Sequence, residues 1–300
     1  MKTNRRDFLK QSTFLIGGTM INNDMSNSSD IFGIKFFCPR WGANDSWDDF
    51  CKRVKEAGYD GIESVHSLDP KLQKEELTAL EKYELKIIGQ YYQSFESNFD
   101  EHLKSFEKHL RNLVSANPIF INSQTGKDWF SFDQNKKIFE TAFRIEKETG
   151  VKIVHETHRG KCLFAAHVTK EYLMKIPDIN LTLDISHWCN VHESLLADQN
   201  DAVDLALSRT NHIHSRVGHQ EGPQINDPRA PEWAKTLESH LAWWDKVVER
   251  YRKDNKILTI TTEFGPANYM PTLPYTQQPV ANQFEINVFM MNLLKKRYLI

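Results

Sequence analysis

The feature that most constrains the fold is an alternation of short β-rich runs with amphipathic helical patterns, which starts near residue 31 and occurs eight times. In chain order the runs are Ile34–Phe37, Gly61–Val65, Leu85–Gly89, Ile119–Asn122, Val151–Glu156, Ile179–Asp184, His212–Val217 and Ile257–Glu263. Strands that alternate with helices favour a parallel sheet. Eight such units predict an α/β fold of one domain, a closed (β/α)8 TIM barrel, because a doubly wound sheet usually has about six strands.

Local signals place several of the helices between these runs. Ser46 is a side chain that can cap the first helix, and Gly150 ends the helix before the fifth run. Thr169 is expected to cap the short helix after the fifth run. The last two helical patterns cover about Pro231–Tyr251 and about Phe284–Lys296.

The first thirty residues are expected to lie outside the barrel. Arg5-Arg6 precede Phe8-Leu9-Lys10, and a mildly apolar stretch (12–21) and a polar linker (22–30) follow. This order resembles a bacterial twin-arginine export signal and predicts a periplasmic location. The alternative is a basic tail that is not an export signal, because the apolar stretch is short and has no clear Ala-x-Ala cleavage site. The predicted division is therefore signal and linker over 1–30 and barrel over 31–300.

Charge and cysteine content exclude several classes of protein. The 38 Lys and Arg residues and 40 Asp and Glu residues give a net charge of −2. Without a basic surplus or stripe, we expect no nucleic-acid partner. The four cysteines lack CxxC spacing, so neither a disulfide framework nor a zinc ribbon is predicted. No apolar run reaches about 18 residues, and we expect no membrane span.

Four metal-competent side chains occupy equivalent places in consecutive units. Glu156, Asp184 and Glu263 each end a predicted strand, and His214 lies on the seventh strand. In a TIM barrel the carboxyl ends of the strands face the active-site mouth. Taken singly, each residue has another explanation: a glutamate can pair with a lysine, Asp184 can cap the next helix, and a histidine can be a core residue.

Taken together, the four residues predict a metal site. Three carboxylates and an imidazole that converge inside a barrel repel one another and lose hydration unless a cation compensates them. One divalent ion supplies that compensation. An oxygen-rich set with a single imidazole suits Mn²⁺, Mg²⁺ or Co²⁺, and Zn²⁺ is a further candidate.

These residues carry a resemblance to a known family. The segments His155-Glu156-Thr157, Asp184-Ile185-Ser186-His187-Trp188, His212-Ile213-His214 and Thr262-Glu263-Phe264-Gly265-Pro266 are similar to those of the xylose-isomerase-like TIM barrels. That superfamily includes sugar isomerases and epimerases, inosose dehydratase-type lyases and endonuclease IV. The resemblance covers about 31–300 and implies that Glu156, Asp184, His214 and Glu263 hold one ion, with His187 contacting substrate.

The chain also departs from the pattern of the ketose 3-epimerases in this superfamily. They carry a substrate-binding arginine six residues beyond the metal-binding histidine, and Gln220 stands there. Arg216 and His219 are the candidates that replace it. A structural salt bridge is the alternative for Arg216, and packing behind Asp184 is the alternative for His187.

The resemblance implies a divalent-metal-dependent sugar isomerase or epimerase. The ion would polarise a sugar carbonyl, and Glu156 and Glu263 would act as base and acid on the adjacent carbon. A lyase or dehydratase acting on a keto sugar or keto-glycoside is the main alternative. An exported enzyme would meet free or oxidised sugars rather than sugar phosphates.

Two further classes are weaker. An endonuclease IV-like phosphodiesterase needs an Asp-x-His after strand seven, where this chain has Asp227-Pro228-Arg229, although His66 resembles one of its ligands. A non-catalytic sugar-binding barrel would usually have lost metal ligands. Barrels of the family often form homodimers, but the sequence contains no self-complementary patch that we can name.

Overall fold

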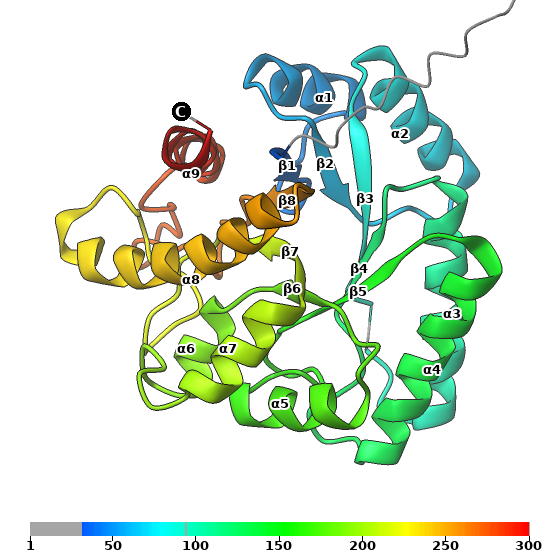
Figure 1. The fold of residues 1–300 in the computed structure, drawn as a ribbon. Coiled ribbons are helices and arrows are strands. Elements are labelled where there is room, and N and C mark those ends of the chain that lie inside the picture. Colours follow the sequence, from blue (N-terminus) through cyan, green and yellow to red (C-terminus); the bar gives the residue numbers. More distant parts are fainter. Residues whose placement is uncertain (1–31, 94, 300) are drawn as a thin grey trace, which may run out of the picture.

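The computed structural model describes residues 32–93 and 95–299, so the predicted export signal and the division at residue 30 lie outside the described residues. Eight parallel strands form a closed barrel in sequence order, with β8 paired to β1. Figure 1 shows this ring of strands surrounded by helices. The predicted single-domain TIM barrel is confirmed. The strands are β1 (Gly33–Pro39), β2 (Gly61–Ser64), β3 (Lys86–Tyr91), β4 (Ile121–Ser123), β5 (Ile153–Glu156), β6 (Leu181–Leu183), β7 (Thr210–His214) and β8 (Ile257–Thr261).

The strand ends differ from the predictions by a few residues, mainly at the active-site side. β7 ends at His214 rather than at residue 217, and β8 ends at Thr261 rather than at residue 263. The chain leaves the ladder at these points, although the Thr262 amide still donates to the carbonyl of Phe37 in β1. Arg216 and Glu263 are therefore placed by loop backbone that follows a strand.

Helices cover the outside of the barrel. They are α1 (Trp47–Glu56), α2 (Pro70–Lys82), α3 (Phe99–Ser115), α4 (Phe132–Thr149), α5 (Ala166–Lys175), α6 (Ser186–Val191), α7 (Asn200–Arg209), α8 (Ala234–Lys253) and α9 (Gln283–Tyr298), with a 3-10 turn, η1 (Pro231–Trp233), before α8. As predicted, Ser46 caps α1 by accepting from the Asp49 amide, and Gly150 ends α4 in the left-handed conformation.

Two details of the helix prediction were wrong or incomplete. α5 begins at Ala166 and has no side-chain cap, so Thr169 lies inside the helix with its hydroxyl buried and unbonded. Helices α6 and α7 lie between β6 and β7, where the sequence analysis assigned none. α6 has only six residues, and its single start signal is Asp184, which accepts from the amide of the first helical residue, Ser186. α7 has no side-chain cap and therefore lacks the start signal on which a sequence reading depends.

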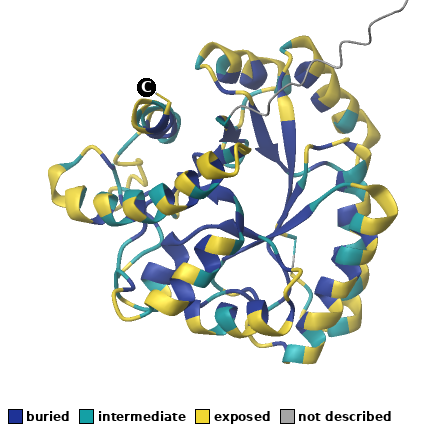
Figure 2. Ribbon diagram, viewed as in Figure 1, coloured by how far each residue is buried: buried dark blue, intermediate teal, exposed yellow. Residues whose placement is uncertain are grey.

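Burial follows the barrel geometry. The strands are almost wholly buried, and exposed residues lie on the outer faces of the helices (Figure 2) and in loops such as 271–280. In the part of the chain that the structure describes, no helix is both long and apolar enough to cross a membrane. The inside of the barrel is partly polar: Glu63, Asn122, His212 and Thr261 come from four strands and are each at most 1% exposed. Such groups must satisfy one another's hydrogen bonds, because water does not reach them.

One buried histidine on the outer layer gives a testable pH dependence. His240 on α8 is fully buried, donates through Nδ1 to the Thr236 carbonyl and accepts from the Gly218 amide. Burial lowers its pKa to about 4, compared with about 6.5 in an unfolded chain. The unfolded chain therefore binds more protons between these values, and stability present above pH 6.5 is lost as the pH falls toward 4. We expect His240 to account for a loss of about 3 kcal/mol in the free energy of unfolding, measured by urea titration at several pH values.

Two variants isolate this contribution. His240→Gln should give a shallower loss of stability between pH 6.5 and 4 than the parent chain. His167→Gln removes an exposed histidine and should leave the parent pH dependence unchanged. Identical pH profiles for His240→Gln and the parent would show that this histidine does not contribute.

Candidate metal centre and active site

The four predicted metal ligands meet at the carboxyl ends of the strands. Glu156 and His214 are the last residues of β5 and β7, Asp184 follows β6 directly, and Glu263 lies two residues beyond β8. All four side chains are buried, with at most 3% exposure. One donor atom from each lies within 4.8 Å of the donor atoms of the others. The barrel thus brings together residues that are up to 107 positions apart in the sequence.

His214 directs one ring nitrogen at the carboxylates. Its Nδ1 lies 2.8 Å from Glu263 Oε2 and 4.0 Å from Glu156 Oε2, yet this nitrogen makes no hydrogen bond. Its Nε2 lies 3.0 Å from Oε1 of Glu63, so we assign the proton to Nε2. Nδ1 can then release its own proton and bind a metal ion between the carboxylates, as a metal-ligating imidazole does. This orphaned nitrogen and three carboxylates fit one divalent ion.

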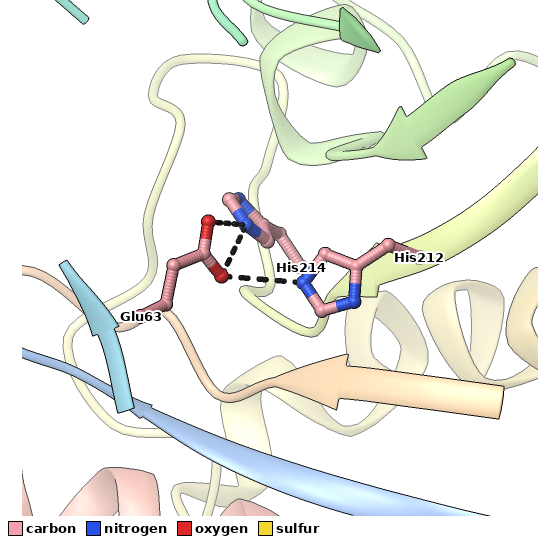
Figure 3. Close-up of side chains that lie close together, drawn as sticks. All are labelled: Glu63, His212 and His214. Carbon is pink, nitrogen blue, oxygen red and sulfur yellow. Dashed lines mark hydrogen bonds and ion pairs between the residues drawn. The ribbon is translucent and has the colours of Figure 1, made fainter. Parts of the chain in front are cut away.

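Glu63, at the carboxyl end of β2, lies behind this histidine. Its carboxylate accepts from Nε2 of His214 and from Nε2 of His212 at 3.2 Å, and it also accepts from the Thr261 hydroxyl. Figure 3 shows Glu63 facing both imidazoles, which come from β7. Burial by itself would raise the pKa of Glu63. The charges and hydrogen bonds of the two histidines outweigh this effect and hold that pKa well below its usual range. Glu63 is therefore a charged residue that fixes the ring orientation of His214.

Amide side chains hold the two glutamates of the cluster. Asn122 donates to Oε2 of Glu156 and to Oε1 of Glu63, each at 2.9 Å, and thereby links the ligand to the residue behind it. Gln124 donates to the other oxygen of Glu156 at 3.3 Å. Gln90 donates to Oε1 of Glu263 at 3.1 Å. These contacts orient the carboxylates before any ligand binds.

Asp184 has a different environment. Its Oδ1 accepts from the amide and hydroxyl of Ser186, and its Oδ2 accepts from Nη2 of Arg216. The contact with the Ser186 amide satisfies the first N–H of α6, so Asp184 also supports the helix start. Asp184 therefore contacts the start of α6 and also belongs to the cluster.

Burial and mutual repulsion perturb the titration of the cluster. Burial, together with the charges of Glu263 and Asp184, raises the pKa of Glu156 to about 8. Burial also raises the pKa of Asp184, although Arg216 opposes it. The pKa of His214 lies well above its usual range, because the surrounding carboxylates outweigh the effect of burial. The raised pKa values show that the cluster has an excess of negative charge, which protons reduce. A bound cation would reduce the same excess.

The three predicted substrate-binding residues lie in different places. Arg216 is buried and contacts Asp184, with Nη2 also 2.7 Å from Nε2 of His187. His187 is fully buried, and its ring lies 3.9 Å from that of His158. His219 packs on Trp233 in the loop after β7. Of these three residues, Arg216 alone lines the cavity above the cluster.

That cavity has a volume of about 210 Å³. Three aromatic residues, three amide or imidazole side chains and two charged residues form its wall: Trp41, Tyr92, Tyr269, Gln90, Gln124, His158, Arg216 and Glu263. Trp41 contributes its indole to this wall, whereas Trp188 is buried and donates to the Leu163 carbonyl. A small polar ligand with one apolar face matches this wall.

The sequence analysis missed the residues that support the cluster. Glu63 gave the same signal as the predicted ligands, an acidic side chain near the carboxyl end of a predicted strand, and could have been found. Asn122 also ended a predicted strand. Tyr269 lies on a loop without a pattern, and no sequence signal would have placed it.

Comparison with known proteins identifies the fold. No protein-family model and no curated protein sequence matches the chain significantly. Among solved structures, the chain is similar to apo 3-keto-D-glucoside 4-epimerase from E. coli (TM-score 0.57, 15% identity, covering 88% of this chain and 99% of that chain). It is also similar to a probable 3-DHS dehydratase from Bacillus anthracis (0.56, 16%, 88% and 99%) and to a sugar phosphate isomerase/epimerase from Parabacteroides distasonis (0.55, 12%, 88% and 94%).

The chain has the fold of the xylose-isomerase-like TIM barrels. At these identities the likeness concerns the fold, and it confirms the resemblance at that level. Endonuclease IV from Thermus thermophilus has the same fold (0.54, 12%, 88% and 99%). The similar structures thus include an epimerase, a dehydratase and a nuclease, and the chemistry of this chain has to be argued from its own residues.

The role of Glu63 can be tested by Glu63→Gln. The amide keeps the size but removes the charge that holds His214, so we expect Mn²⁺ or Co²⁺ affinity to fall by about 10- to 100-fold, measured by calorimetry. The chain offers a matched control, because Glu76 is another buried glutamate paired with a histidine, 3.0 Å from His66.

Glu76→Gln should lower stability without changing metal affinity. If the two variants lose the same affinity, or if Glu63→Gln loses none, Glu63 has no special relation to the metal centre. Circular dichroism of both variants checks that the barrel is formed.

Proposed function

We propose that this chain is a divalent-metal-dependent sugar isomerase or epimerase whose ion is held by Glu156, Asp184, His214 and Glu263. The observation that carries the proposal is the unbonded Nδ1 of His214, buried among three carboxylates. The donor set suits Mn²⁺, Mg²⁺ or Co²⁺. The fold shared with a 3-keto-D-glucoside epimerase supports a sugar substrate.

When bound, the ion would supply Lewis-acid polarisation of a sugar carbonyl and a neighbouring hydroxyl. The side chains would do the proton chemistry. Glu156 and Glu263 reach the cluster from β5 and from beyond β8, so they approach a sugar from different directions. One carboxylate takes the proton from the carbon beside the carbonyl, and the electron pair moves into an enediolate. The other carboxylate, protonated, returns a proton to the opposite face or to the neighbouring carbon.

The remaining residues of the cavity would position the sugar. Gln90 and Gln124 hold the two proton-transfer carboxylates in place by hydrogen bonds. Trp41 would offer a ring face to C–H groups of the sugar. Arg216 lines the cavity and offers positive charge to a bound substrate. His187 contacts Arg216 and Asp184, so we assign it to orienting Arg216 rather than to direct substrate contact.

A metal-dependent lyase or dehydratase is the second candidate. The same carbanion expels a group bound to the β carbon when one is present, and a similar structure is that of a probable 3-DHS dehydratase. The endonuclease reading has less support: Asp227 pairs with Arg229 at 2.7 Å, and His66 pairs with Glu76. Neither residue joins the cluster. The proposal also includes export by residues 1–30, which favours a free or oxidised sugar as substrate.

Metal content tests the proposal directly. Elemental analysis of the purified chain loaded with Mn²⁺ or Co²⁺ should find about one ion per chain, and Asp184→Ala should bind none because a carboxylate ligand is lost. Asp227→Ala removes an aspartate that pairs with Arg229 outside the cluster and serves as the matched control. It should retain one ion.

The ion should also raise the melting temperature of the parent and of Asp227→Ala but not that of Asp184→Ala. Two or three ions per chain would point to phosphoester hydrolysis. A parent chain that binds no ion would leave a sugar-binding barrel without catalysis as the remaining account.

The proton chemistry has its own test in D₂O. Incubation with keto sugars should give products that carry deuterium at the carbon next to the carbonyl. Glu156→Gln and Glu263→Gln should each lower this rate by about 10²- to 10⁴-fold, because each removes a proton-transfer group. Glu140→Gln changes an exposed glutamate on α4 and should have no effect. Deuterium in an epimer supports the isomerase, whereas loss of a β substituent supports the lyase, and no exchange with any keto sugar argues against both.

A further inference from the structure

Two arginines converge on one tyrosine at the wall of the cavity. The guanidinium carbon of Arg216 lies 4.8 Å from the ring centre of Tyr269, and that of Arg159 lies 5.0 Å from the same ring. Tyr269 and Arg216 both line the cavity. Arg159 comes from the loop after β5 and Arg216 from the loop after β7, so two separate loops bring positive charge to the same place.

Not all N–H groups of the Arg216 guanidinium are used by contacts within the protein. Its Nε donates to the Ser186 hydroxyl at 3.2 Å, and its Nη2 is occupied by Asp184 and His187. Its Nη1 has the carboxylate of Glu263 at 3.7 Å, which is too long for a hydrogen bond. Nη1 therefore keeps hydrogen-bonding capacity for a ligand.

Arg159 is half-buried and has no charged partner among the described residues. Its Nη1 donates to the side-chain oxygen of Asn190 at 3.2 Å. No carboxylate within residues 32–93 and 95–299 lies within ion-pair distance of it. A partly desolvated guanidinium without an anion is unfavourable, and a planar guanidinium matches the two oxygens of a carboxylate.

The pairing of the two arginines gives the same result. Arg216 is paired with Asp184, whereas no carboxylate of the described residues pairs with Arg159. One positive charge beside Tyr269 is therefore uncompensated. A carboxylate neutralises this charge, whereas a phosphate monoester carries nearly two negative charges at pH 7 and exceeds it.

We propose that the substrate is a sugar acid, whose carboxylate binds between Arg159 and Arg216 beside Tyr269 while its sugar hydroxyls and carbonyl face the metal cluster. This rests on the proposed function and names the substrate class of that same site. The carboxylate end lies on the side of Tyr269, and the reacting carbons lie on the side of Glu156 and Glu263.

Binding to the Mn²⁺-loaded protein tests the proposal without an assay of turnover. The probes are pairs of sugars that differ only at carbon six: D-glucuronate with D-glucose, and D-galacturonate with D-galactose. Calorimetry should give at least about tenfold lower Kd for the acid in at least one pair. Arg159→Gln should abolish this preference, and Arg159→Lys should restore part of it.

Arg229→Gln is the matched control, because Arg229 is an arginine that pairs with Asp227 and lies over the ring of Phe289 rather than that of Tyr269. It should keep the parent preference. D-glucose 6-phosphate tests the other anion, and tighter binding of this sugar than of D-glucuronate overturns the carboxylate assignment. Equal affinities within both pairs, including no binding, or a preference that survives Arg159→Gln, overturn the proposal as well.

Elemental analysis of the same samples keeps the two proposals apart. One ion per chain with no preference for acids leaves the metal-dependent function standing and removes the sugar acid. Absence of the ion removes the proposed function, whatever the sugars do.

Discussion

The structure depends on how the negative charge of three carboxylates inside the barrel is compensated. Glu156, Asp184 and Glu263 are almost completely buried and place oxygen atoms within 4.8 Å of one another. Such a cluster is costly without positive charge. Arg216 compensates part of it through Asp184, and His214 is held beside the other two carboxylates. The remaining imbalance is the reason why we propose a metal centre here and not a structural ion-pair network.

The polar interior of the barrel serves this arrangement. Glu63 receives hydrogen bonds from two histidines of β7, from Asn122 of β4 and from Thr261 of β8, and Asn122 also holds Glu156. Five strands are thereby connected across the barrel. The contacts leave Nδ1 of His214 facing Glu263 and Glu156. Since every member is buried, a change in one of them is transmitted to the ligands.

Sequence reasoning succeeded where a residue type and its position on a strand were sufficient. The carboxyl ends of parallel strands must meet at one rim, so Glu156, Asp184, His214 and Glu263 could be placed together before any coordinates were known. The same argument applied to Glu63 but was not made. It failed for α6, which has only six residues, for α7, which has no capping side chain, and for Thr169, which packs inside a helix and does not cap it.

The sequence by itself determined the eightfold alternation, the closed barrel and the rim on which the ligands lie, because these follow from local periodicity and the geometry of parallel strands. Only the tertiary structure decided what surrounds the ligands. Arg216 contacts Asp184 and lines the cavity, His219 lies away from it on Trp233, and Arg159 joins Arg216 at Tyr269. Loops place these side chains, and loop geometry depends on contacts between distant segments that no pattern in the sequence encodes.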